Sequence, residues 1–394
     1  MELAERIARR RSSRQGGRVV VDRDHLSPVV HRPEPVGRGP VLEQLLDALE
    51  PVFDGELPPP VAVVGPPGSG TSAIVTALFD ALNDQFSGST RSIGTTTRAG
   101  STGPVTWFGT VDGRRVGSPF SFYQAVLSAI SNEPVPESGI GTDALRKRLR
   151  DRLARPNRRV IVAIDHHDEP ETLDAGRARE LLAPVDEHVT IVPVGQREPD
   201  DWKGTTVSVP AYRDHELVDV ITDRASTGLA AGTLDHDTVR DLAAWADGNA
   251  HDALAALFGA AVLASEADAD RIERDHLEAA RADVPETGVH VGRALALSET
   301  RQQVLLSLIE LDAADRPIRE IATAIAGRSS LTAGTVKRFL YELADRGVIE
   351  RVPLSTSDRG SGRQPSTVRP LFPTIAFRSL AATSVQSADR NDSG

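Results

Sequence analysis

The chain has 394 residues, of which 39% are hydrophobic and 26% charged, and its formal net charge is −11, so two or three domains with hydrophobic cores are expected. No apolar run is long enough to span a membrane and no hydrophobic leader follows Met1, which argues against a membrane protein and favours a cytoplasmic one. The absence of cysteine excludes disulfides and thiolate metal sites, and the histidines lack ligand spacing, so we expect no structural metal.

Residues 1–35 are expected to form a basic N-terminal arm. Its clustered arginines are Arg6, Arg9, Arg10, Arg11, Arg14 and Arg18. Such a cluster can bind nucleic acid, but the serine and glycine content is equally typical of a disordered segment. A helical pattern follows at residues 41–50, and the prolines at 58–60 separate it from the next element.

A glycine-rich turn follows the apolar residues 61–64 and leads into a helical pattern over residues 72–82. The turn fits the phosphate-loop pattern G-x-x-x-x-G-K-[ST], except that Thr71 stands where the lysine belongs. Glycines let backbone N–H groups face an anion, and a helix N-terminus favours negative charge. Ser72 stands at the position of the hydroxyl that binds Mg²⁺. The loop could therefore cradle ATP or ADP, but the missing cation argues against rapid hydrolysis.

Alternating strands and helices predict an open, parallel α/β sheet. After a loop at 83–104, the patterns give strands at 105–111, 159–165 and 189–194 and helices at 120–130 and 145–153. Asp165 ends the second of these strands, and Gln196 follows the third. Open α/β sheets carry their sites at the carboxyl ends of the strands, so both residues are expected there.

From residue 210 onward the pattern is wholly helical. Four helices at 214–225, 235–245, 249–265 and 275–282 predict a small lid. A short hinge at 283–292 precedes a third unit, in which helices at 298–311, 317–326 and 333–346 come before a hairpin with a basic loop at 355–367. Ser298 and Thr332 are predicted N-caps, and Gly347 is a predicted left-handed C-cap. This order predicts a winged helix-turn-helix.

Charge favours a DNA-binding surface in the third unit. Residues 315–378 contain eleven basic and six acidic side chains, a net charge of +5 against −16 for the rest of the chain. Such a local reversal is typical of a nucleic-acid surface. We expect the third helix and the hairpin loop to bind double-stranded DNA through Lys337, Arg338, Arg359 and Arg363. The alternative is that this unit contacts another protein.

The basic residues are almost all arginine, and the only lysines are Lys147, Lys203 and Lys337. An acidic, lysine-poor chain suits an organism with a salty cytoplasm, because carboxylates keep a protein surface hydrated. A GC-rich genome, which also favours arginine over lysine, is the alternative explanation.

Several segments, in order, resemble archaeal replication initiators of the origin-recognition type, which are AAA+ ATPases. They are residues 26–30 with 36–39, the phosphate loop, 207–225, 248–254 and 275–280. The resemblance covers residues 20–380. It implies an α/β fold class with an AAA+ P-loop parallel-sheet domain at 36–209, a helical lid at 210–290 and a C-terminal winged helix-turn-helix at 291–382, between the arm at 1–35 and a disordered tail at 383–394.

The resemblance also implies a site for ATP or ADP with Mg²⁺. Ser72 and Asp165 match the residues that hold and orient the metal ion, and beyond this orienting role of Asp165 no catalytic residue is identified. The nucleotide-binding set would be Gly65, Pro66, Pro67, Gly68, Ser69, Gly70, Thr71, Ser72, Ile74, Tyr212 and His251.

The chain departs from the family at the charged positions of this site. Thr71 replaces the loop lysine, His166 the water-activating glutamate, Gln196 the first-sensor asparagine and His251 the second-sensor arginine. Residues 197–207 contain no clear arginine finger. Arg197 and Lys203 are the nearby cations that could replace the lysine. Each lost charged hydrogen bond costs about 1.5–3 kcal/mol, so several losses together predict weak or lost hydrolysis.

We therefore expect a DNA-binding, replication-initiator-like AAA+ protein that acts in origin recognition or DNA replication. Nucleotide would have a structural role or be absent. Besides double-stranded DNA, the expected partners are other initiator subunits or replication proteins. Two alternatives remain: a functional DNA-dependent ATPase switch, and a transcriptional regulator on an initiator scaffold.

Overall fold

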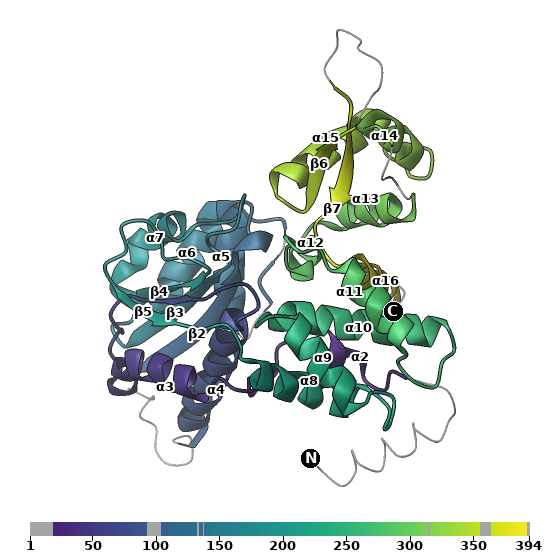
Figure 1. Ribbon diagram of the computed structural model, residues 1–394. Coiled ribbons are helices and arrows are strands. Elements are labelled where there is room, and N and C mark those ends of the chain that lie inside the picture. The colour runs from purple at the N-terminus through teal and green to yellow at the C-terminus, as the bar shows by residue number, and fades with distance from the viewer. Residues whose placement is uncertain are drawn as a thin grey trace. The chain divides into compact units, whose positions relative to one another are not determined.

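The computed structural model describes residues 19–92, 104–131, 134–136, 138–311, 313, 316–354 and 364–391. Backbone contacts divide the chain into two compact units (Figure 1). The sheet unit is His31–Glu216. The helical unit joins Met1–Val30 to Leu217–Gly394.

The sheet unit is built on five parallel strands in the order β2-β3-β4-β1-β5. The strands are β1 (Val61–Val64), β2 (Val105–Asp112), β3 (Arg158–Asp165), β4 (Val189–Gly195) and β5 (Thr205–Ser208). The predicted parallel α/β sheet is confirmed, and β5 is an additional short strand. Val64 pairs with Gly195, and Val194 pairs with Asp165. This register brings the ends of β1, β4 and β3 to one edge of the sheet.

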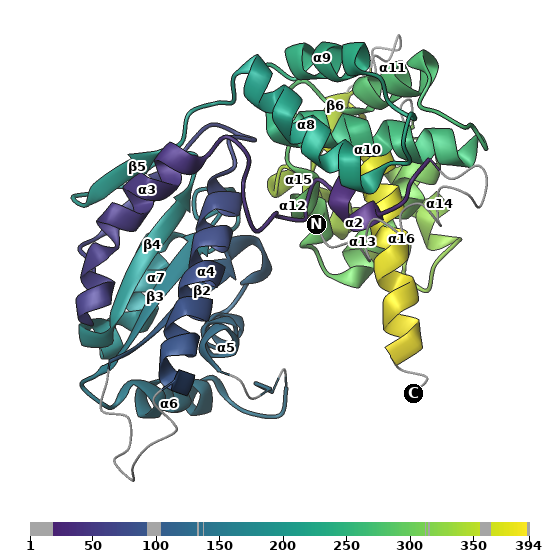
Figure 2. The same ribbon diagram turned by 90° about the horizontal axis from the view of Figure 1, so that it is seen from below.

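Helices cover both faces of the sheet, which is why its strands are nearly continuous apolar runs (Figure 2). Alternate residues of β3 face opposite ways: Ile161 packs with the helices α3 (Gly39–Ala48) and α4 (Thr71–Ser92), and Val162 packs on the other face. The helices on that second face are α5 (Pro119–Ile130), α6 (Thr142–Leu153) and α7 (Ala175–Leu182). The phosphate loop thus joins a buried strand to a helix packed on the same sheet.

The expected loop at 83–104 is wrong in its first part, because α4 continues to Ser92. Asn83 gives the reason: its side-chain amide donates to the carbonyl of Phe108 at 2.7 Å and accepts from the N–H of Phe108 at 3.0 Å. This contact fastens the helix along β2, so tertiary packing outweighs the weak helix preference of this polar sequence. Residues 93–103 lie outside the described residues. Helix α7 was also not expected from the sequence.

The helical unit begins with the four helices predicted as a lid. They are α8 (Asp214–Gly228), α9 (His236–Trp245), α10 (Ala250–Glu266) and α11 (Arg274–Asp283). Helix α10 is buried over most of its length, which fits its alanine-rich sequence, because small side chains allow neighbouring helices to approach closely. Asp235 and Asn249 cap α9 and α10 by accepting backbone N–H groups.

The N-terminal segment differs from the expected extended arm where the structure describes it. Residues 19–30 pack on the helical unit and contain a short helix, α2 (Arg23–Leu26). Val20 forms a β-bridge with Leu229, and Leu26 is fully buried. Arg224 donates to the carbonyls of His25 and Val30. Apolar burial therefore orders this part, whereas the arginines at positions 6–18 lie outside the described residues.

The C-terminal part contains helices followed by an antiparallel pair of strands, in the order that the sequence predicted. Its elements are α12 (Val291–Leu295), α13 (Glu299–Glu310), α14 (Ile318–Ala326), α15 (Ala333–Asp345) and the antiparallel strands β6 (Ile349–Pro353) and β7 (Ser366–Pro370). Two predicted caps are confirmed: Thr332 accepts the N–H of Thr335, and Gly347 has a φ of +64°. Ser298 occupies the predicted N-cap position without a side-chain cap bond.

A final helix, α16 (Thr374–Asn391), runs into the segment expected to be a disordered tail. Asp283 fixes its first turn, because its carboxylate accepts from the hydroxyl of Thr374 and from the N–H of Ile375. Phe372 and Phe377 are fully buried and meet edge to face at 4.9 Å. Capping and aromatic packing therefore start a helix that the sequence pattern did not indicate.

Candidate nucleotide site and DNA-binding surface

The phosphate loop has the backbone geometry that its glycines allow. Gly68 and Gly70 have φ values of +70° and +88°, which L-residues rarely adopt. A Cβ at Gly65 would lie 2.5 Å from both the Ser69 hydroxyl and the carbonyl of Val209. The N–H of Ile74 donates to the carbonyl of Gly70, so the helix begins directly after the turn. The loop is tightly packed and leads into the N-terminus of α4.

The two predicted magnesium residues lie together. The hydroxyl of Ser72 donates to Oδ1 of Asp165 at 3.0 Å, and Asp165 is buried at the end of β3. A serine hydroxyl beside a buried carboxylate is the oxygen pair that Mg²⁺ favours next to a phosphate. The sheet register therefore assembles the expected metal position from residues 93 positions apart.

His166 lies between two carboxylates. Its backbone is left-handed, with a φ of +58°. Its Nε2 is 3.3 Å from Oδ2 of Asp165, and its Nδ1 is 3.3 Å from Oε1 of Glu169. Burial by itself lowers the pKa of His166, but Asp165 and Glu169 outweigh burial and raise the pKa above its ordinary value. A histidine held by two carboxylates thus stands at the position for which the family resemblance implies a glutamate. The sequence did not single out Glu169.

The first-sensor position follows β4. Asp168 accepts the backbone N–H groups of Gln196 and Arg197 at 3.0 and 2.9 Å, and the side chain of Gln196 is exposed. Arg197 is 78% exposed and directs its Nε toward Asp168 at 3.7 Å. Asp168 therefore holds this turn, and the Arg197 guanidinium lies beside a carboxylate.

Lys203 is wrongly placed to replace the loop lysine. It lies just before β5, where the N–H of Thr205 donates to the carbonyl of Pro60 and Thr205 pairs with Val61. This is the edge at which β1 begins, whereas the phosphate loop follows the end of β1. A four-residue strand, rising about 3.3 Å per residue, separates the two edges, and a lysine side chain does not bridge them.

Arg38 is a site residue that sequence reasoning missed. Its side chain is 1% exposed, donates from Nε to the carbonyl of Ser69 at 3.0 Å and donates from Nη2 to the carbonyl of Pro210 at 3.0 Å. Its guanidinium lies 3.4 Å from the centre of the Tyr212 ring. Arg38 therefore links the phosphate loop to the segment that carries Tyr212. The quoted family segment 36–39 contains it, but spacing alone gave it no role.

His251 makes its described contacts inside the helical unit. Its Nε2 accepts the N–H of Val291 at 3.1 Å, and its Nδ1 is 3.0 Å from Oδ1 of Asp252. Its ring lies 3.8 Å from the ring of His290. The side chain is 7% exposed. Both ring nitrogens are thus engaged between α10 and the start of α12, and the nucleotide-binding role of His251 stays a prediction.

The sheet-unit residues fit a bound phosphate and Mg²⁺ but lack a cation that points into the loop. The positive φ values at Gly68 and Gly70 give the backbone of a cradle, and the buried Ser69 hydroxyl has no hydrogen-bond partner. Nucleotide would supply the phosphate oxygens that complete the metal position beside Ser72 and Asp165. In the described part of the chain, no cluster of three His, Asp or Glu side chains could hold a metal ion by itself, and no helix could cross a membrane.

A basic surface lies on α15 and β6 of the C-terminal part. Lys337 and Arg338 are exposed on α15, as predicted. Tyr341 lies between Lys337, 5.9 Å from its ring centre, and Arg351 of β6, at 4.8 Å. Glu342 on the same helix is already paired, because it bonds both Arg301 and Arg346. Arg359 and Arg363 lie outside the described residues. The Arg351–Tyr341 contact was not found from the sequence, because it joins a helix to a strand.

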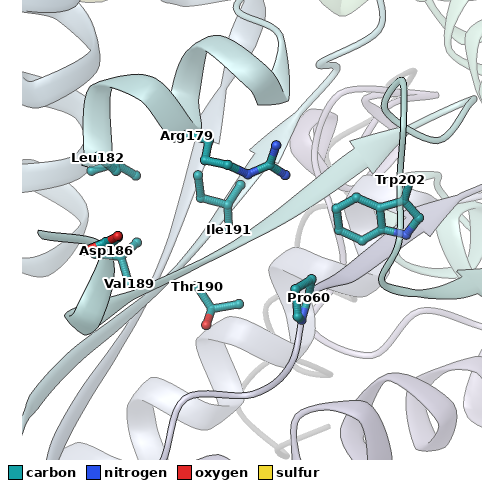
Figure 3. Close-up of a pocket in the computed structure, with 8 residues that line it drawn as sticks. All are labelled: Pro60, Arg179, Leu182, Asp186, Val189, Thr190, Ile191 and Trp202. Atoms are coloured by element: carbon teal, nitrogen blue, oxygen red, sulfur yellow. The ribbon is translucent and has the colours of Figure 1, made fainter. Parts of the chain in front are cut away.

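One cavity, of about 200 Å³, lies where β4 begins and is lined by Pro60, Arg179, Leu182, Asp186, Val189, Thr190, Ile191 and Trp202 (Figure 3). The buried indole N–H of Trp202 has no hydrogen-bond partner. Because β1 and β4 are parallel, this is the sheet edge opposite the phosphate loop. The cavity is therefore not part of the nucleotide site.

Known protein families and relatives match this architecture. Residues 34–192 match the model of an AAA ATPase domain, and residues 218–282 match that of the Cdc6 AAA+ ATPase-type lid domain. The chain is 25% identical over 355 residues to ORC1-type DNA replication protein 1 of Aeropyrum pernix, covering 82% of this chain and 86% of that protein. It is 24% identical over 353 residues to ORC1-type DNA replication protein 10 of Halobacterium salinarum, covering 81% and 82%.

Solved structures show the same fold. The Aeropyrum pernix ORC1 protein in complex with DNA superposes with a TM-score of 0.59 at 23% identity, over 94% of this chain and 98% of that one. Cdc6p from Pyrobaculum aerophilum superposes with a TM-score of 0.52 at 16% identity, over 94% and 99%. The chain thus contains an AAA ATPase domain followed by a Cdc6-type lid domain, and over most of its length it is similar to ORC1-type DNA replication proteins.

Proposed function

We propose that this protein binds double-stranded DNA as a replication-initiator-type factor, with the winged helix as its main contact. The observation that carries the proposal is the Lys337–Tyr341–Arg351 cluster beside Arg338, in which cations on two elements flank one aromatic ring. Bringing like charges together costs free energy unless an anion neutralises them. Glu342 is engaged by Arg301 and Arg346 and does not neutralise this cluster, and a DNA phosphate is a partner whose charge fits it.

Fluorescence anisotropy with a labelled duplex, measured over a salt series, tests this proposal. The double variant Lys337→Ala/Arg338→Ala should weaken binding and flatten the slope of log K against log salt by about 0.9 for each phosphate contact removed. Arg274→Ala is the control for charge removal elsewhere, because it removes an exposed arginine on α11 that is paired with Glu278. Equal DNA affinity of the double variant and the native protein would refute the winged-helix contact.

We propose further that the AAA+ module binds ATP or ADP with Mg²⁺ and hydrolyses ATP weakly or not at all. The Ser72–Asp165 pair and the loop backbone support binding. Thr71 in the lysine position and the exposed Gln196 side chain argue against turnover, because phosphoryl transfer depends on cations and on an ordered water. Phosphate release by the native chain and by Thr71→Lys, with and without DNA, tests this. Release by the native chain well above a no-enzyme control would favour an ATPase switch instead.

The source organism and the cellular location of the protein are also part of this proposal. The similarity to proteins of Halobacterium salinarum, the scarcity of lysine and the net charge of −11 support a halophilic archaeal source and a cytoplasmic location. Other initiator subunits or replication proteins are the proposed protein partners. Folding that requires molar KCl, followed by circular dichroism, would support the halophilic origin. Full stability in dilute buffer would favour genome composition as the reason for the arginine bias.

A further inference from the structure

The phosphate loop of this chain has a buried cation that does not belong to its sequence motif. Arg38 is the largest fully buried side chain among the described residues, at 1% exposure. None of the carboxylates in that part of the chain forms an ion pair with it. Its partners are instead the carbonyls of Ser69 and Pro210 and the ring of Tyr212. Beside the loop, the guanidinium therefore has no carboxylate counter-ion among the described residues.

A charge in this position calls for an explanation. Burying an ionised group without a counter-ion is unfavourable, and hydrogen bonds donated to neutral carbonyls offset only part of that cost. Buried charges of this kind concentrate at functional sites. An anion bound in the loop would compensate the charge, and the loop itself has Thr71 where such sites normally place a lysine.

The hydrogen bonds of Arg38 also hold the phosphate loop in its conformation. Ser69 lies between Gly68 and Gly70, the two residues with positive φ, so the bond from Nε holds the turn in which backbone N–H groups can face an anion. The bond from Nη2 and the stacking on Tyr212 fix the guanidinium from the other side. A Cβ on Gly70 would lie 3.0 Å from the Tyr212 hydroxyl, so loop, tyrosine and arginine pack as one body.

We propose that Arg38 is the cationic positioning residue of the phosphate loop: it holds the loop in its anion-binding form and supplies the positive charge that Thr71 cannot. The ligand class is the di- or triphosphate of a nucleotide. This inference rests on the proposed nucleotide binding and is independent of the proposed DNA contact. It assigns the compensation for the missing lysine to a residue 33 positions earlier, rather than to Arg197 or Lys203.

The test is a double-mutant cycle read by equilibrium binding. Calorimetry would measure the affinity of the full-length native chain, Arg38→Gln, Thr71→Lys and the double variant for Mg-ADP and for inorganic pyrophosphate. We expect Arg38→Gln to lose about ten- to a hundredfold in affinity, the effect of one charged interaction. Thr71→Lys in the same chain should recover most of the loss, because it returns a positive charge to the loop. A purely structural role would not be rescued this way.

Arg224→Gln is the matched control. Arg224 is also buried, at 7% exposure, and also donates to two backbone carbonyls, those of His25 and Val30, but it belongs to the helical unit. Its loss should lower the melting temperature without changing ADP affinity. The inference is overturned if native protein binds neither ligand, if Arg38→Gln binds as tightly as native protein or more tightly, or if Thr71→Lys gives no recovery. Duplex binding by the same preparations reports separately on the DNA proposal.

Discussion

Restoring the family's arginine at position 251 should destabilise this protein. The His251 ring is 7% exposed, and its Nε2 accepts the N–H of Val291 at 3.1 Å. Arginine has no acceptor, so His251→Arg would leave that N–H buried without a partner, which costs about 1–3 kcal/mol. It would also remove the contact between the rings of His251 and His290, worth about 0.5–1.5 kcal/mol. We therefore expect the free energy of unfolding to fall by about 2–4 kcal/mol.

Urea unfolding measures this loss, followed by circular dichroism and by tryptophan fluorescence, to which Trp245 contributes from the same unit. His251→Gln is the informative control, because its side-chain oxygen can still accept the N–H of Val291, and it should cost only about 1 kcal/mol. The reasoning would be refuted by a His251→Arg protein as stable as the native one. Equal losses for the two variants would show that the acceptor at position 251 is not what matters.

Three further outcomes are expected. Asn83→Leu should lower the free energy of unfolding by about 2–4 kcal/mol in urea titrations, because the N–H and the carbonyl of Phe108 in β2 both lose their hydrogen-bond partner. Asn83→Asp should cost less. A loss below about 0.5 kcal/mol for Asn83→Leu would contradict this reasoning. Ser72→Ala should make ADP affinity insensitive to replacing Mg²⁺ by EDTA, as calorimetry would reveal, and a retained metal effect would place the ion elsewhere. Arg351→Ala should flatten the slope of log K for DNA binding against log salt by about 0.9. Arg369→Ala removes a charge that is already paired with Glu350 and should change this slope less. Equal slopes for the two variants would argue against a DNA contact by the Tyr341 cluster.

The sequence predictions that are confirmed depended on local features of the chain. The apolar run before Asp165 could only be a buried parallel strand, and register then placed Ser72 within hydrogen-bond distance of it. Thr332 and Gly347 marked the two ends of α15 because capping depends on one residue's own side chain or φ. The sequence pattern failed where an outcome depended on a partner distant in sequence. Helix α4 continues past Asn83 because the Asn83 side chain hydrogen-bonds the backbone of Phe108.

The changes at the candidate site also depended on distant partners. A threonine in the lysine position is visible in the sequence, but the buried guanidinium of Arg38 is visible only once Ser69, Pro210 and Tyr212 are brought around it. No spacing rule connects these positions, because each belongs to a different connection between elements. The sequence therefore suggested a site that had simply lost charge, whereas the folded sheet unit keeps one buried cation at the same loop.

The contacts of His251 bear on how nucleotide and DNA binding are coupled. A ligand shifts the affinity for a second ligand only if it interacts differently with two states of the protein. An arginine in the second-sensor position has donors that respond to a phosphate, whereas both ring nitrogens of His251 are already engaged between α10 and α12. The same ring rests against His290, at the start of the segment that leads to the winged helix. The position that the family resemblance assigns to the second sensor thus makes its described contacts inside the helical unit. If the proposed DNA contact holds, these contacts favour DNA binding that does not depend on whether the phosphate loop is occupied.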